Sequence, residues 1–364
     1  MRPGRPVRDG SATKVPLSSN SPAPCARLPR QCPRPLVARS GAAPGQRPGA
    51  IAGLWRGETA LNLAQMQSLL DRQRLPAEFV QAHSRALPNG ANAWLYPQGG
   101  WVNPPALVAA WLNAPGIDVR LNTAVDALRA MPGGGWQLLG RDGSELTRVD
   151  AVVLANAHGL SRLVPDGLAN TWRLQATRAQ SSVLPTTLQI DLPRLTLPIA
   201  DRGYVLRLAD GSLLCGGASS DPVAVDHVGW PDTDTLTAAD HARNLHTLAR
   251  LTGWQAPVDP AMLHGHTGWR LASADRMPVI GPLPMSNLTA TPGRLEQSRW
   301  VPRQPGLYVL SALGSRGLIQ AALGGDVLAS WLTGSPIPAP ASLLDAIDPA
   351  RFVARAVRLK SRPF

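Results

Sequence analysis

The sequence predicts an α/β fold in which a lobe of mixed helices and strands is interleaved with a second, β-rich domain. Val149–Ala155 is a continuous apolar run of the kind that forms a strand buried on both faces. Leu307–Leu310 is a further strand, and a glycine turn connects it to a helix expected over Gly317–Leu332. Between these two segments, from Thr171 onward, the composition shifts to longer strands that favour an antiparallel sheet.

The other elements are expected from hydrophobic spacing and from turn residues. Asn103 and the two prolines after it indicate a helix start, because asparagine caps a helix and proline is tolerated in its first turn. Asp142-Gly143 indicates a hairpin. We expect helices over Leu61–Arg72, Pro76–Ser84, Asn103–Leu112 and Thr235–Leu251. We expect strands over Ile117–Leu121, Val125–Ala130, Trp136–Gly140, Leu174–Leu184, Thr187–Leu192, Tyr204–Leu208 and Ser212–Ala218.

The first 57 residues show no helical or strand period. They contain ten prolines and seven glycines, and no aromatic residue precedes Trp55. Chains of this composition bury too little apolar surface to fold. We therefore expect residues 1–57 to be a disordered or non-homologous leader. The prolines also argue against the amphipathic helix of a transit peptide.

The net charge of +12 is concentrated at the two ends of the chain. Residues 1–57 hold ten Lys and Arg against one acid, and residues 351–364 hold five basic residues and no acid. The part between them is nearly neutral. The basic C-terminal segment, 351–364, has arginines at helical spacing. It could serve RNA phosphates or only solubility, and the sequence leaves both interpretations open.

Several functional classes find no support in the sequence. No apolar run is long enough for a membrane helix. The three cysteines, at positions 25, 32 and 215, lack metal-site spacing, and their odd number favours a reducing compartment, which we expect to be the cytoplasm. His264 and His266 share one side of a strand but lack a third ligand nearby, so no metal is expected. His241 and His246 are interpreted as solvated.

Arg270 is the first candidate site residue. It lies near the end of an expected strand. A polar turn, Ala272–Asp275, follows, and then a short apolar segment that ends before Gly281. A guanidinium offers a planar fork of donors that matches a carboxylate bidentately, which lysine cannot do. On spacing alone, a salt-bridged arginine at a domain edge is the alternative.

The second candidate is the start of the helix at Gly317. Its backbone N–H groups lack intrahelical partners and carry the positive end of the helix dipole. Such an end can hold an anion or an electron-rich ring edge. An ordinary strand-to-helix connection is the alternative.

In this order and spacing the two candidates resemble a known family. Arg270, the pattern Asp275-x-x-Pro278-x-x-Gly281 and the stretch Leu313–Leu318 are similar to glycine and D-amino-acid oxidases. Further stretches resemble the flavin-dependent oxidoreductase half of the MnmC family, which acts in tRNA wobble-uridine modification. They are Leu95–Pro104, Val152–His158 and Leu343–Phe352.

The resemblance implies a cofactor, a reaction and a substrate. The cofactor is FAD, and the reaction is oxidative removal of the carboxymethyl group from 5-carboxymethylaminomethyl-2-thiouridine in tRNA. Arg270 would bind the substrate carboxylate. The flavin nucleotide would lie near Asn156 and Ala157, and its ring near Gly314, Ser315, Arg316, Gly317 and Leu318. The later methylation would need a separate methyltransferase.

The resemblance also implies a division of the chain. Residues 58–170 and 260–350 would form the remainder of an FAD-binding, Rossmann-like lobe, and residues 171–259 the antiparallel substrate domain of the D-amino-acid oxidase type. This family places a G-x-G-x-x-G turn near its N-terminus to receive the pyrophosphate. Here Pro48 and Ala50 occupy the places of the first two glycines, so we expect the lobe to be incomplete unless another chain completes it.

Two alternative functions remain open at this point. One is an oxidase of free glycine or another small amino acid. The other is a catalytically inactive fragment that lacks the dinucleotide-binding motif.

Overall fold

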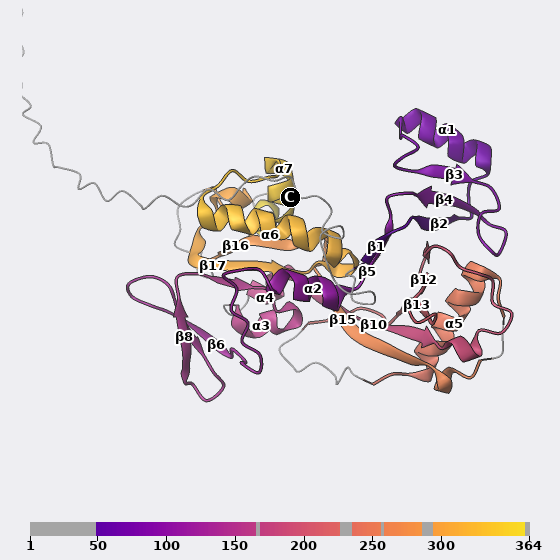
Figure 1. Cartoon of the computed structure of the whole chain (residues 1–364). Helices are drawn as coiled ribbons and strands as arrows, with labels where there is room; N and C mark the ends of the chain where they lie inside the picture. Colours follow the sequence, from indigo (N-terminus) through magenta and orange to yellow (C-terminus); the bar gives the residue numbers. More distant parts are fainter. Residues whose placement is uncertain (1–48, 165–167, 226–234, 256–257, 286–293, 361–364) are drawn as a thin grey trace, which may run out of the picture.

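The computed structural model describes residues 49–164, 168–225, 235–255, 258–285 and 294–360. Their strands form a nine-stranded sheet, two three-stranded sheets and one two-stranded pair. Figure 1 shows two bodies, one built on the nine-stranded sheet and one on the β16–β17–β9 sheet, joined by the long strands β10 (Gln175–Leu184) and β15 (His264–Ala272).

The nine-stranded sheet is antiparallel except where β2 pairs with β11 in parallel. Its order after β10 is β13 (Leu213–Ser219), β12 (Tyr204–Arg207), β11 (Ile199–Ala200), β2 (Leu54–Glu58), β4 (Asn92–Tyr96) and β3 (Gln81–His83). β14 (Val223–Ala224) and β15 pair with β10. Two helices pack on this sheet, α5 (Ala238–Thr252) on β10–β13 and α1 (Leu63–Gln73) beside β3.

Local signals define both of these helices. Thr237 accepts a hydrogen bond from the Asp240 backbone and caps α5, and Gly253 ends it in the left-handed region, where glycine lacks a Cβ penalty. Leu248 and Leu251 of α5 then pack with core residues of β10, β12 and β13. Asn62 and Gln65 form a reciprocal capping box at α1.

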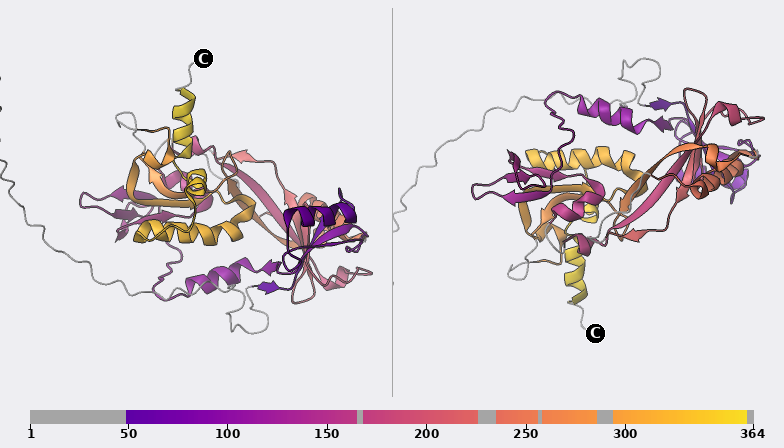
Figure 2. Two further views of the ribbon diagram at one scale, coloured as in Figure 1. Left: turned by 90° about the horizontal axis from the view of Figure 1, so that it is seen from above. Right: turned by 90° about the horizontal axis from the view of Figure 1, so that it is seen from below.

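The second body is a three-stranded sheet of β16 (Val279–Pro284), β17 (Arg303–Ser311) and β9 (Val152–Leu154). The long helix α6 (Gly317–Thr333) covers it, with Val327 and Leu328 packed against Ile280. α8 (Arg351–Lys360) projects from this body toward the C-terminus, as both views in Figure 2 show.

The remaining elements are short. They are β1 (Gly49–Ile51), paired with β5 (Gly100–Val102), the helices α2 (Pro104–Leu112), α3 (Leu160–Leu163), α4 (Leu168–Trp172) and α7 (Ala341–Ile347), and the meander of β6 (Ala127–Ala130), β7 (Trp136–Leu139) and β8 (Glu145–Val149). Short 3-10 turns include η2 (Ala157–Gly159), η3 (Thr186–Leu188) and η6 (Gly314–Arg316).

Most expected elements are confirmed. Asn103 caps α2, and the Asp142-Gly143 hairpin joins β7 to β8. Three of the expected helices and strands are absent from the structure. Pro76–Ser84 is a turn followed by β3 rather than a helix, and Thr187–Leu192 contains η3 rather than a strand. Ile117–Leu121 is an exposed connection without strand pairing, because an apolar alternation forms a strand only beside a sheet edge.

The expected strand Val149–Ala155 also differs from the structure. Val149 ends β8, and β9 covers only Val152–Leu154. Among the described residues β9 pairs only with β17, so it is an edge strand and Val153 is 40% exposed. Burial on both faces is therefore wrong for this strand.

The expected domain limits need two corrections. Residues 49–57 are not part of an unstructured leader, because β1 and most of β2 lie there. The segments 58–96 and 264–272 do not join the β16–β17–β9 sheet. Their strands β3, β4 and β15 pair within the nine-stranded sheet, since β2 offers an edge to β4, and β10 offers one to β15. Residues 1–48 lie outside the described residues.

Candidate functional site

Arg270 lies on β15, where the two bodies of the molecule meet. Along this strand His264, His266, Gly268 and Arg270 alternate with less exposed residues, so they share the exposed face. Arg270 lies directly opposite Thr177 of β10. The long, fully paired β10–β15 ladder therefore fixes the backbone that carries the guanidinium.

Two cavities meet at Arg270. One has a volume of about 690 Å³ and the other about 340 Å³, and both are lined by Arg270 together with Gly314, Ser315 and Arg316. The larger cavity is also lined by Tyr204, His266, Gly268, Gly317 and Leu318. The structure thus brings Arg270 together with all five residues expected at the helix start.

Arg270 has no carboxylate ion pair within the described ranges. The salt-bridged alternative raised by the sequence is therefore not supported there. Burial raises the pKa of Tyr204, Cys215 raises it further, and the charge of Arg270 acts in the opposite direction. Tyr204 and Arg270 line the same larger cavity, where the guanidinium is available to an anion.

The start of α6 is built to leave its N–H groups accessible. The backbone turns sharply before it, with Ala312 and Gly314 both at positive φ. A bridge between Ala272 and Leu313 ties this turn to β15. Arg316, at the N-cap position, makes no side-chain cap hydrogen bond. The first turn of α6 therefore lines the cavity with unsatisfied donors and a positive dipole end.

Asn156 and Ala157 occupy a different place. They follow β9 and begin η2, and both are exposed. Ala157 has φ 47°, a left-handed conformation that is strained for a residue with a Cβ. Neither residue lines the two cavities at Arg270.

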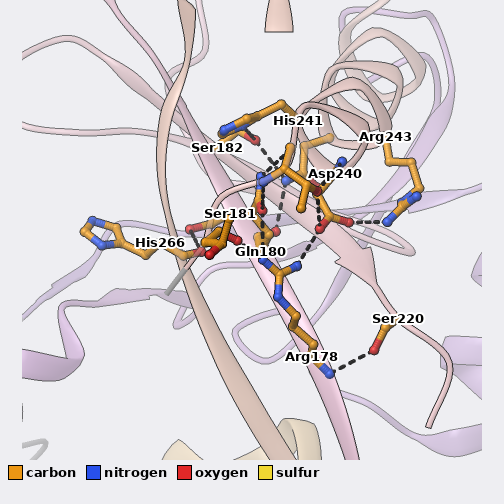
Figure 3. Close-up of polar contacts among 12 residues, drawn as sticks. Arg178, Gln180, Ser181, Ser182, Ser220, Asp240, His241, Arg243 and His266 are labelled. Carbon is orange, nitrogen blue, oxygen red and sulfur yellow. Dashed lines mark hydrogen bonds and ion pairs between the residues drawn. The ribbon is translucent and has the colours of Figure 1, made fainter. Parts of the chain in front are cut away.

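A polar network connects β10 to α5 and the residues at its N-terminus (Figure 3). Arg178 donates to Asp240 of α5 at 2.6 Å, and Gln180 donates to the Thr237 carbonyl at 3.0 Å. His241 Nδ1 lies 2.7 Å from the Ser182 hydroxyl and its side chain is buried, so the interpretation of His241 as solvated is wrong. The network joins the helix cap of α5 to the strand that pairs with Arg270.

A second network holds the turn that follows Arg270. Arg351 of α8 donates to both carboxylate oxygens of Asp275, at 2.9 and 3.0 Å, and to the Met277 carbonyl at 3.0 Å. Burial alone would raise the pKa of Asp275, but hydrogen bonds from Arg351 and Ser273 outweigh it and hold that pKa well below its usual range. Arg355 pairs with the same carboxylate at 2.7 Å.

The network corrects the idea of one RNA-binding arginine face on residues 351–364. Arg351 is buried against the turn and Arg355 is paired, so neither is free for phosphate. Arg362 lies outside the described residues.

The cavities fit part of an FAD molecule. Gly268 and Gly317 keep side chains away from the cavity floor, and the first turn of α6 and Arg316 supply donors for the edge of a flavin ring. The stretch Gly49–Gly53 does not provide a pyrophosphate turn. It forms β1, paired with β5, and continues into β2 without an intervening helix. The residues described here therefore fit the flavin half better than the pyrophosphate half.

Sequence reasoning missed two residues of the site. Tyr204 begins a short strand and His266 lies on the Arg270 face of β15, and both line the larger cavity. The alternation of His264, His266 and Arg270 was the available signal for His266. Tyr204 carried no local signal, because the pairing of β12 with β13 is what places it there.

In the described part of the chain, no group of three or more His, Cys, Asp or Glu side chains lies close enough together to hold a metal ion. No helix in this part of the chain is long and apolar enough to span a membrane. Cys215 is buried, and burial raises the pKa of its thiol to about 12.

Comparison with known proteins identifies a family. The family model of FAD-dependent oxidoreductases matches residues 28–331, so the match begins inside the expected leader. The chain is 36% identical over 326 residues to the tRNA 5-methylaminomethyl-2-thiouridine biosynthesis bifunctional protein MnmC of Methylibium petroleiphilum, covering 85% of this chain and 48% of that protein. It is 38% identical over 321 residues to the MnmC protein of Burkholderia orbicola, covering 83% and 47%. The chain thus spans about half the length of these relatives.

Solved structures show the same fold. Glycine oxidase from Geobacillus kaustophilus aligns with a TM-score of 0.61 and 19% identity, covering 83% of this chain and 75% of the oxidase. L-Proline dehydrogenase from P. horikoshii aligns with a TM-score of 0.58 and 13% identity, covering 84% and 77%. At these identities the likeness shows the fold alone, which confirms the predicted α/β architecture with a β-rich domain of the D-amino-acid oxidase type.

Proposed function

Because the chain belongs to the FAD-dependent oxidoreductase family, we propose that it oxidises the carboxymethylamine of a modified wobble uridine in tRNA. The two relatives described above are named for tRNA 5-methylaminomethyl-2-thiouridine biosynthesis. Their names do not specify which step this half of the protein performs. The proposal assigns it the removal of the carboxymethyl group from 5-carboxymethylaminomethyl-2-thiouridine.

The observation that carries the proposal is the guanidinium of Arg270, which has no carboxylate partner among the residues that the structure describes and lies beside the start of α6. The substrate ends in a secondary amine, a methylene carbon and a carboxylate, as in an N-substituted glycine. Arg270 binds the carboxylate as a bidentate fork, with the hydroxyl of Tyr204 close to the same region. This contact places the methylene carbon at a fixed distance from the first turn of α6.

The residues of this chain orient the substrate and set its electrostatics. FAD, when bound, supplies the redox chemistry by accepting the two electrons and one hydrogen of the methylene C–H bond. Arg316 and the N–H groups of Gly317 and Leu318, which line the larger cavity, would hold the flavin ring and stabilise negative charge on it. The amine lone pair forms the imine, and water then cleaves it to glyoxylate and the aminomethyl base.

The test uses FAD-supplemented protein and tRNA that carries the carboxymethylaminomethyl group. Release of glyoxylate, matched by the appearance of the aminomethyl nucleoside, is the expected result. Free glycine serves as the control substrate. Glyoxylate from glycine but none from tRNA would favour the amino-acid oxidase instead. With FAD demonstrably bound, no product from either substrate would support an inactive chain.

A chain completing the cofactor lobe and a separate methyltransferase are the proposed protein partners. The first is suggested by β9, which is an edge strand among the described residues. The second is suggested by the length of the relatives, which are called bifunctional and are about twice as long.

A further inference from the structure

A third cavity in the described part of the molecule is not lined by Arg270. It has a volume of about 1020 Å³ and lies between α1, the β2–β4 pair and the loop that precedes β12. Small-molecule sites commonly have about 300–1,000 Å³. Because two of its lining residues are Arg56 and Arg202, we call it the Arg56–Arg202 cavity.

The strand pattern explains why this cavity combines aromatic and charged groups. Leu54, Arg56 and Glu58 alternate on one face of β2, while Trp55 points to the core on the other face. Trp94 and Tyr96 lie on the same cavity face of β4, opposite Arg56 and Leu54 in the register. Thus α1 and this sheet face enclose a pocket with aromatic walls.

One aromatic ring is unusually open. Phe79, in the turn between α1 and β3, is 54% exposed although it lines the cavity. Its ring lies 6.4 Å from the Tyr96 ring at an interplanar angle of 84°, so the two rings do not stack on each other. A planar group can therefore stack on Phe79 without displacing a neighbour.

The charges of the cavity favour an anion. Arg56 and Arg202 are exposed and form no ion pair with any carboxylate in the described ranges. The two acidic residues of the lining already have donors. Asp201 pairs with Arg250 at 2.7 Å, and Glu58 accepts from Trp94 Nε1 at 3.0 Å and from the Ala60 backbone at 2.8 Å. The available charged groups of the lining are therefore the two guanidinium forks.

The Arg56–Arg202 cavity and the larger cavity at Arg270 are lined by neighbouring residues of the chain. Gly203 lines the former and Tyr204 lines the latter. A polymer whose reacting end lies near Tyr204 would extend past Arg202 to reach the Arg56–Arg202 cavity.

We infer that the Arg56–Arg202 cavity binds an unpaired nucleotide that flanks the reacting base, with its base on Phe79 and its phosphate on Arg56 and Arg202. This inference rests on the proposed tRNA substrate. Bases stack on aromatic side chains in single-stranded RNA recognition, and arginine forks bind phosphate bidentately. A duplex cannot offer an unstacked base, so the cavity selects single-stranded RNA.

The test measures binding by fluorescence anisotropy for a labelled single-stranded RNA, a duplex RNA of the same length, and tRNA. Phe79→Ala is expected to weaken single-strand and tRNA binding at least about fivefold, with little effect on the duplex. Phe79→Trp keeps the stacking surface and should restore binding. Arg56→Gln with Arg202→Gln should lower the salt-dependence slope by about 0.7, since both arginines are assigned to one phosphate and each single-strand phosphate contributes about 0.7.

Arg141→Gln is the matched control, because it removes an equally exposed charge from the distant β7–β8 hairpin. It should leave both binding and slope unchanged. Single-strand binding by Phe79→Ala equal to that of the unaltered chain would overturn the inference, as would equal loss in Arg141→Gln. Glyoxylate release from tRNA by the unaltered chain distinguishes the two failures. If glyoxylate is released but Phe79→Ala binds normally, only the inference about this cavity fails. If no glyoxylate is released, the proposed function itself fails.

Discussion

Replacing Arg351 with methionine should destabilise the protein far more than the same change at Arg355, although both arginines pair with Asp275. The Arg351 side chain is 3% exposed and that of Arg355 is 46% exposed. Arg351 also donates to the carbonyls of Met277, Ile347 and Asp348 at 3.0–3.1 Å. Its loss removes two donors from the Asp275 carboxylate and the Arg351 donor from the buried Ile347 carbonyl. Asp275 keeps the donors Ser273 Oγ, Met277 N–H and Arg355.

The magnitude follows from burial. Removing one partner of a buried ion pair costs about 3–5 kcal/mol, while an exposed pair contributes about 0–1 kcal/mol. Since Arg355 still pairs with Asp275 in the Arg351→Met variant, we expect a loss of about 3 kcal/mol in the free energy of unfolding. Arg355→Met should cost less than about 1 kcal/mol.

Urea unfolding followed by tryptophan fluorescence measures both variants against the unaltered chain. Trp172 is a useful reporter, because it is buried and its Nε1 donates to Pro349 O at 3.0 Å, beside the start of α8. The reasoning fails if the two variants lose the same free energy, or if Arg351→Met loses less than about 1 kcal/mol.

Four further outcomes are expected. Arg270→Lys keeps the charge but loses the fork, so kcat/KM for carboxylated substrate should fall in steady-state assays, by an amount that corresponds to about 1.5–3 kcal/mol of transition-state stabilisation. The free energy of unfolding should stay unchanged, and an unchanged kcat/KM removes Arg270 from the site. Tyr204→Phe should raise KM about tenfold, and a KM equal to that of the unaltered chain would exclude the hydroxyl as a donor. The pKa of Asp275 is lowered in the folded state, so this carboxylate contributes fully to the free energy of unfolding above its unfolded pKa of about 3.9. The contribution is lost as pH falls toward the folded pKa. The free energy of unfolding of Asp275→Asn should therefore depend less steeply on pH in acid, and an unchanged pH profile would contradict this. The chain alone should purify largely without flavin, because no pyrophosphate turn occurs among the described residues, and a stoichiometric, tightly held FAD by absorbance would refute this expectation.

Arg270 and the start of α6 could be named as candidates from local signals, and the resemblance to the oxidase family then suggested that they share one site. An arginine on a strand before a polar turn, and a glycine turn before an alanine-rich helix, each depend on a few adjacent residues. The structure places both at the same two cavities. Helix α2 could be predicted for the same reason, since Asn103 and the following prolines define its start.

The missed features depend on contacts between distant segments. Tyr204 enters the site through the register of β12 with β13, which its own sequence does not encode. The sequence around His241 indicates an exposed helix face. In the structure His241 is buried and forms a hydrogen bond with Ser182, which lies 59 positions earlier in the chain. In the sequence Arg351 is one of several basic residues at helical spacing. In the structure it donates to Asp275, which lies 76 positions earlier in the chain. In each case a partner across the fold changed the interpretation.

The most direct test of the account is anaerobic mixing of the FAD-loaded protein with tRNA that carries the carboxymethylaminomethyl group. The oxidised flavin absorbance should bleach in one turnover, with one glyoxylate released per flavin reduced, and the Arg270→Lys variant should bleach at least about tenfold more slowly. Bleaching that is equally fast in Arg270→Lys, or absent in the unaltered chain with FAD bound, would contradict the assignment of this site.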